Sequence, residues 1–158
     1  MTVRLTALAV CLMLAAFVPM AGAEEAPAEP LRYLQEQAVA GQRLPALVDA
    51  FERMCGMAIP GVPEEDVLLL YETGEYDFTG ERLFYFSLVR QYPGGDGEYV
   101  QLRLEVTFAP TAETKGFLRT DWDDFVEGDF FAHVRSSEEY AALADVQPVS
   151  IEVRREET

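Results

Sequence analysis

Five acidic residues surround a tryptophan and two phenylalanines in the segment DWDDFVEGDF, residues 121–130. Carboxylates clustered in this way could bind a cation or act as catalytic acids. An EF-hand calcium loop needs oxygen ligands at its first, third and fifth positions and glycine at its sixth. Counted from Asp121, the fifth position is Phe125 and the sixth is Val126. The segment therefore does not match a calcium loop.

The same segment fits a short amphipathic helix. Thr120 is a suitable N-cap, and Trp122, Phe125 and Val126 fall on one helical face. The first turn would then carry three aspartates, Asp121, Asp123 and Asp124. The helix dipole favours negative charge at that end. We expect a capped helix with inward-facing aromatic side chains; a weak cation site and a catalytic role for Asp123 are the alternatives.

Nucleophilic catalysis finds little support in the sequence. His133 is the only histidine, and the alternation around it predicts a strand on which it shares a face with Phe131 and Arg135. No serine lies in the G-x-S-x-G pattern of a hydrolase nucleophile. A dyad of Cys55 and His133 is conceivable, although Cys55 ends the apolar stripe of a predicted helix. The weak catalytic candidates are therefore His133, Asp123 and Cys55.

Metal and cofactor binding are not predicted. The chain has one histidine and two cysteines, with no close spacing of zinc ligands among them. Glycines in the segment PGGDG, residues 93–97, lack the lysine and spacing of a phosphate-binding loop. We therefore expect neither a metal site nor another cofactor.

The N-terminus has the pattern of a secretory signal peptide. Arg4 is the single charge before an apolar run over residues 5–20, and the small residues Ala21 and Ala23 precede the expected cleavage point. Cleavage after Ala23 would export the rest of the chain to the periplasm or the extracellular space. An uncleaved anchor is less favoured, because the run is shorter than the roughly 20 residues of a membrane span.

Acidic residues outnumber basic ones, 28 to 12, and give the chain a formal charge of −16. Such an excess repels phosphates, which disfavours nucleic acid and, after signal cleavage, an anionic membrane as partners. A basic protein partner is compatible with this charge. Cleavage would also remove Cys11, so Cys55 would have no disulfide partner and apolar burial must stabilise the domain.

Periodicity divides residues 31–158 into the elements of a single α+β domain, preceded by an acidic, proline-rich spacer at 24–30. The expected helices span residues 31–41, 45–55 and 136–143. The expected strands span residues 67–71, 83–89, 100–108, 129–135 and 149–153, followed by a solvated tail. Helices before strands predict N-terminal helices packed on an antiparallel sheet of about four to five strands, with a short helix between the last two.

The strand LFYFSLV, residues 83–89, is apolar on both faces. Phe84 and Phe86 lie on one face, and Leu83, Tyr85 and Val89 lie on the other. The N-terminal helices can cover one of these faces. The sequence leaves open whether another part of the chain, a partner or a ligand covers the second.

These observations favour an exported, non-enzymatic binding protein, of an inhibitor or immunity type, that recognises a basic partner through its acidic surface and one sheet face. The candidate binding residues are Tyr85, Phe86, Trp122, Asp121 and Asp124. The alternative is a small hydrolase or ligand-binding domain. Its pocket would lie between sheet and helices and would combine Tyr85, His133 and carboxylates of residues 121–129. The oligomeric state stays open.

Overall fold

A computed structural model describes residues 29–112, 114, 123–125 and 129–157 of the chain. The helices are α1 (Pro30–Gln37), α2 (Leu44–Cys55), α3 (Phe130–Ser136) and α4 (Glu138–Leu143), with short 3-10 turns η1 (Glu64–Asp66) and η2 (Gly95–Gly97). The strands are β1 (Leu68–Phe78), β2 (Glu81–Pro93), β3 (Tyr99–Phe108), β4 (Asp123–Phe125) and β5 (Ser150–Glu157). The expected signal peptide, residues 1–23, lies outside the described residues.

The strands form one antiparallel sheet in the order β4-β1-β2-β3-β5. Its centre is the β2–β3 hairpin that the sequence predicts, with Ser87 opposite Glu105. The hairpin turns at Asp96 and Gly97, which have φ angles of 61° and 83°. Glycine adopts such angles without strain, and aspartate tolerates them better than most residues. The predicted α+β architecture is therefore confirmed.

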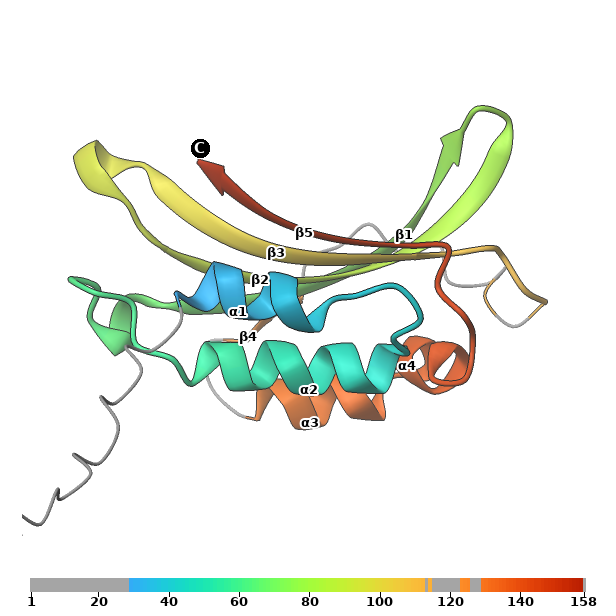
Figure 1. The fold of residues 1–158 in the computed structure, drawn as a ribbon, viewed down its shortest axis with the longest axis horizontal. Coiled ribbons are helices and arrows are strands. Elements are labelled where there is room, and N and C mark those ends of the chain that lie inside the picture. The colour runs from blue at the N-terminus through green and yellow to red at the C-terminus, as the bar shows by residue number, and fades with distance from the viewer. Residues whose placement is uncertain (1–28, 113, 115–122, 126–128, 158) are drawn as a thin grey trace, which may run out of the picture.

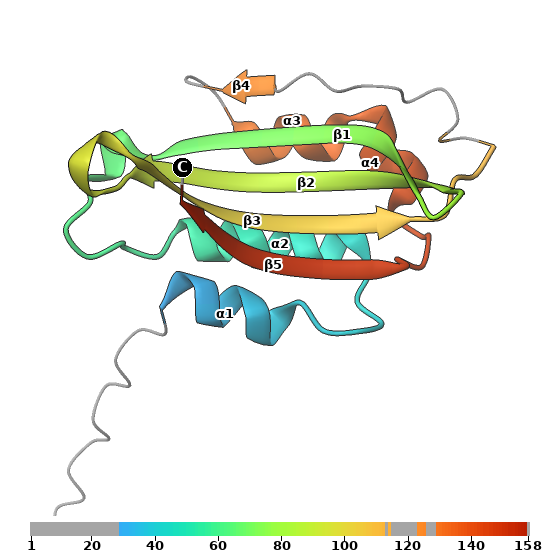
Figure 2. The same cartoon turned by 90° about the horizontal axis from the view of Figure 1, so that it is seen from above.

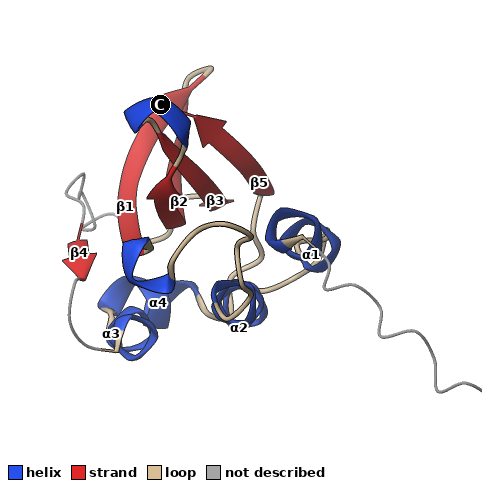
Figure 3. Ribbon diagram, turned by 90° about the vertical axis from the view of Figure 1, so that its left-hand side faces the viewer, coloured by secondary structure: helices blue, strands red, loops and turns tan. Residues whose placement is uncertain are grey.

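The helices all lie on one side of the sheet, and the sheet curves away from them at both ends (Figures 1 and 3). Phe84, Phe86 and Leu88 of β2 are fully buried on the helix side, in one core with Leu47 and Phe51 of α2. α1 lies beside β5 at the edge of the layer (Figure 2). The opposite face of the sheet is concave, and none of the described helices covers it (Figure 1).

The predicted strand at 129–135 is wrong, because this segment forms α3. The Asp129 carboxylate accepts a hydrogen bond from the Ala132 amide at 3.1 Å and so caps the helix. Phe130, Phe131 and Val134 are buried at helical spacing. The next helix, α4, is capped by Ser137, whose hydroxyl accepts from the Tyr140 amide, so it begins slightly later than the predicted helix at residues 136–143.

Two further expectations are corrected at the sheet edges. Residues 123–125 form β4, with Asp124 opposite Leu70 of β1, so they do not belong to the expected short helix. The rest of that segment, residues 115–122 and 126–128, lies outside the described part of the chain. Residues 154–157 belong to β5 instead of a solvated tail, because β3 extends far enough for Val100 to pair with Glu157.

Candidate functional site

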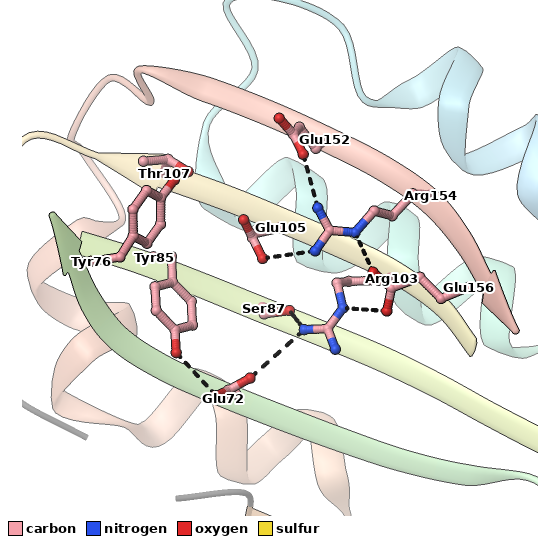
Figure 4. Close-up of polar contacts among 10 residues, drawn as sticks. All are labelled: Glu72, Tyr76, Tyr85, Ser87, Arg103, Glu105, Thr107, Glu152, Arg154 and Glu156. Carbon is pink, nitrogen blue, oxygen red and sulfur yellow. Dashed lines mark hydrogen bonds and ion pairs between the residues drawn. The ribbon is translucent and has the colours of Figure 1, made fainter. Parts of the chain in front are cut away.

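Polar side chains from four strands meet on the concave face of the sheet (Figure 4). In antiparallel pairs, residues directly opposite each other point to the same face. The register therefore brings Glu72, Ser87, Glu105 and Glu152 into one row across β1, β2, β3 and β5. The concave-face network, as we call it, comprises Glu72, Tyr76, Tyr85, Ser87, Arg103, Glu105, Thr107, Glu152, Arg154 and Glu156.

Arg103 occupies the centre of this network although only 9% of its surface is exposed. Its guanidinium donates a hydrogen bond to the Ser87 hydroxyl at 2.9 Å. The same group lies 3.7 Å from a Glu72 oxygen and 3.3 Å from a Glu156 oxygen. A buried charge is costly unless opposite charges and hydrogen bonds surround it, and Arg103 has both. Its position is consequently fixed by three different strands.

Glu72 is held from a second side by Tyr85. The Tyr85 hydroxyl donates to a Glu72 carboxylate oxygen at 3.0 Å, and the glutamate side chain is only 14% exposed. Partial burial of the phenol, together with its hydrogen bond to the Glu72 carboxylate, raises the pKa of Tyr85 to about 12. Tyr85 is therefore a neutral hydrogen-bond donor to Glu72 at physiological pH.

Arg154 forms ion pairs with two carboxylates of its own strand, β5, and with one carboxylate of β3. Its nitrogens lie 2.6 Å from Glu156, 3.0 Å from Glu152 and 3.5 Å from Glu105. The network thus carries four glutamates and two arginines, as Figure 4 shows. An ionised carboxylate accepts hydrogen bonds and donates none. The lone pairs that Arg103, Arg154 and Tyr85 leave free can therefore receive hydrogen bonds from a cationic group.

Two of the predicted binding residues, Tyr85 and Phe86, lie on opposite faces of the sheet. Tyr85 lies on the concave face, whereas its neighbour Phe86 is fully buried against the helices. Asp124 belongs to β4, in register with Leu70. Asp121 and Trp122 lie outside the described residues.

The weak catalytic candidates lie on three elements, and two of them, Asp123 and His133, both neighbour Tyr71 of β1. His133 is an exposed residue of α3, with its ring 5.9 Å from that of Tyr71 on the helix side of the sheet. Tyr85 points away from that side. Asp123 belongs to β4 and Cys55 ends α2. Within the described ranges, the structure does not bring Tyr85 and His133 into one cavity.

Cys55 is poorly suited to nucleophilic chemistry. Desolvation raises the pKa of its thiol to about 12, although the nearby Arg90 guanidinium acts in the opposite direction. Arg90 is buried and donates hydrogen bonds to the backbone oxygens of Met54 and Met57 at 3.0–3.1 Å. This arginine therefore fastens the end of α2 to β2, which is a structural role.

The sequence contained a signal for the concave-face network that periodicity alone could not interpret. Arg103 and Glu105 alternate with apolar residues in β3, and Glu152 and Arg154 follow Ile151 and Val153 in β5. Alternation of this kind normally marks a solvent-exposed face. Only the register shows that charges of opposite sign meet across the strands.

Comparison of the chain with protein-family models, curated proteins and solved structures finds no match. Within the described part of the chain, no group of three or more histidine, cysteine, aspartate or glutamate residues is arranged to hold a metal ion. No helix there is long and apolar enough to cross a membrane. The concave-face network is accordingly the candidate site on which a functional proposal can be based.

Proposed function

We propose that the protein is an exported, non-enzymatic binding protein that receives a basic partner on the concave face of its sheet. The observation that carries this proposal is the set of half-buried carboxylates, above all Glu72 and Glu105, held in fixed positions on a concave surface. Their side chains are 14% and 17% exposed. An inhibitor or immunity protein acting on a basic target is one form of this function.

Preorganisation supports the proposal. The carboxylates are already oriented by Tyr85, Arg103 and Arg154, so a partner would not have to order flexible side chains on binding. Association normally loses free energy for each rotamer-rich side chain that becomes fixed. A lysine or arginine of a partner would meet acceptors whose positions are already set.

Charge gives the proposal a second, kinetic support. A formal charge of −16 attracts a basic protein over long range and accelerates encounter. The signal-peptide pattern at residues 1–23 is in keeping with a partner outside the cytoplasm. The overall charge guides the partner to the molecule, and the concave face provides the specific contacts.

An arginine-rich peptide is a suitable probe because it presents the guanidinium groups that the site would recognise. We expect the double substitution Glu105→Gln/Glu152→Gln to weaken its binding roughly three- to tenfold in calorimetry at low salt. Arg154 keeps Glu156 at 2.6 Å in this variant, so the sheet should stay folded. Raising the salt from about 50 mM to about 500 mM should weaken binding to the wild type strongly.

The matched control is Glu138→Gln/Asp145→Asn, which removes the same charge from exposed residues in and after α4. These two residues lie on the helix side of the molecule, so the control should change the affinity less than twofold, as expected for distant surface charge. Equal weakening by both double variants would mean that binding follows the net charge alone, and the proposed site would be wrong.

A further inference from the structure

Two adjoining cavities lie at the end of the molecule that carries the β2–β3 hairpin, away from the concave-face network. The first, which we call the apolar chamber, has a volume of about 470 Å³ and is lined by Leu31, Met57, Ile59, Tyr92 and Leu102 among others. The second, the acidic chamber, has a volume of about 520 Å³. Tyr92 and Arg155 line both chambers, so the two lie side by side.

The apolar chamber exists because the helix layer ends before the sheet does. α2 stops at Cys55, while β2 continues to Pro93. Tyr92 and Leu102 point to the helix side of the sheet beyond this point and form the floor. The start of α1 and the loop at residues 56–60 form the walls. Its volume lies within the roughly 300–1,000 Å³ typical of small-molecule sites.

The acidic chamber is shaped by the glycine-rich hairpin turn, residues 94–97. Asp96, Glu98 and Glu157 contribute carboxylates, and Arg155 contributes the one guanidinium among its lining residues. Arg155 is already paired with Glu157 at 2.9 Å. Within the described part of the chain, Asp96 and Glu98 form no ion pair, so the chamber retains an excess of two negative charges.

From these two chambers we infer a binding site for a cationic amphiphile: a molecule with an apolar tail and an ammonium-type head. The tail fits between Leu31, Met57 and Leu102, where contact with water would be lost. The head reaches past Tyr92 to Asp96 and Glu98. This site differs from the proposed concave binding face in both position and ligand class.

Dodecyltrimethylammonium, kept below its micelle-forming concentration, is the probe for this site. We expect the full-length protein to bind it with a one-to-one stoichiometry in calorimetry. Asp96→Asn/Glu98→Gln should weaken this binding roughly three- to tenfold, in keeping with partly exposed ion pairs. Asparagine tolerates the left-handed backbone of residue 96, so this variant should fold.

Met57→Gln tests the apolar chamber independently. It keeps the side-chain length and the backbone oxygen that accepts from Arg90, but puts an amide against the tail. This variant should weaken dodecyltrimethylammonium and dodecyl sulfate alike, whereas the Asp96/Glu98 variant should weaken only the cationic probe. The control Glu138→Gln/Asp145→Asn should leave both affinities within twofold, since its charges lie at the other end of the helix layer.

Three results would overturn the inference. If Asp96→Asn/Glu98→Gln and the control variant weaken probe binding equally, the probe is attracted only by the net charge of the protein. Multiple probe molecules per protein without saturation would indicate detergent adsorption. Weaker probe binding at higher protein concentration, with dimers in sedimentation, would assign the apolar chamber to a second copy of the chain.

Discussion

The two faces of β2 are both buried, but for different physical reasons. Phe84 and Phe86 are fully buried because helices cover them. Ser87 and Val89 are equally buried on the concave face, which none of the described helices covers. There polar side chains take the place of helices, and the Arg103 guanidinium donates a hydrogen bond to the Ser87 hydroxyl.

This contrast separates the face that stabilises the fold from the face on which we propose that a partner binds. Apolar burial on the helix side is non-directional and contributes most of the folding free energy. The concave side is held by hydrogen bonds and ion pairs, whose net contribution is modest because desolvation offsets attraction. Such a network fixes geometry more than it adds stability. The concave face therefore contributes less to the stability of the fold than the helix side does.

The largest effect is expected on the helix side. Phe86→Ala removes a fully buried ring from the core between β2 and α2 and should lower the free energy of unfolding by about 3–5 kcal/mol. Urea denaturation followed by circular dichroism measures this change.

Tyr85→Ala, at the next residue of the same strand, serves as the comparison. Its ring is partly exposed on the concave face, so the loss should be clearly smaller. If Tyr85→Ala costs as much as Phe86→Ala, the concave face is a second core and the distinction drawn between the faces is wrong.

An intermediate effect is expected at Arg103. Arg103→Met removes the donor to Ser87 and leaves Glu72 and Glu156 without their shared cation. We expect an unfolding free energy lower by about 1–3 kcal/mol, as for hydrogen bonds to partly buried charges. Arg103→Lys keeps the charge but loses the planar fork of donors, so it should restore only part of the loss. A methionine variant as stable as the wild type would show that the network contributes no stability.

Most of the fold could be predicted because, in most segments, the local sequence pattern and the tertiary packing favour the same secondary structure. The β2–β3 hairpin follows from alternation and a glycine-rich turn, and α2 follows from its apolar stripe and Pro45 near its start. β1 was predicted only to Tyr71, because Gly74, Glu75 and Asp77 disfavour strands. Pairing with β2 along the whole length of β1 overrides that local preference.

The wrong prediction for α3 and the failure to predict the concave-face network both come from relying on local sequence periodicity. α3 was mistaken for a strand because Phe131, His133 and Arg135 suggested an alternating face, while its helical spacing extends over only two turns. The concave-face network depends on register, and Glu72 meets Arg103 only through pairing of β1, β2 and β3. Local sequence periodicity assigns residues to faces but does not state which residues of distant strands lie opposite each other.

The smallest and most specific effect is expected for Tyr85→Phe at alkaline pH. Loss of the hydrogen bond to Glu72 should lower the unfolding free energy by about 0.5–1.5 kcal/mol at pH 8. The folded-state pKa of Tyr85, about 12, lies above its ordinary value of 10.0, so folding favours the protonated phenol. This contribution is fully present below pH 10 and is lost as the pH rises toward 12.

The stability gap between wild type and Tyr85→Phe should therefore narrow between pH 10 and pH 12. Cys55, on the helix side, also has a raised pKa of about 12, but its contribution begins to fall from pH 9.0 and is common to both proteins. Introducing Cys55→Ala into both the wild type and Tyr85→Phe removes the contribution of the thiol. Urea denaturation under reducing conditions at several pH values then measures the stability gap that is due to Tyr85. A gap that stays constant over this range would mean that the phenol does not depend on Glu72, and the carboxylate would then not be held in place as the proposed binding face requires.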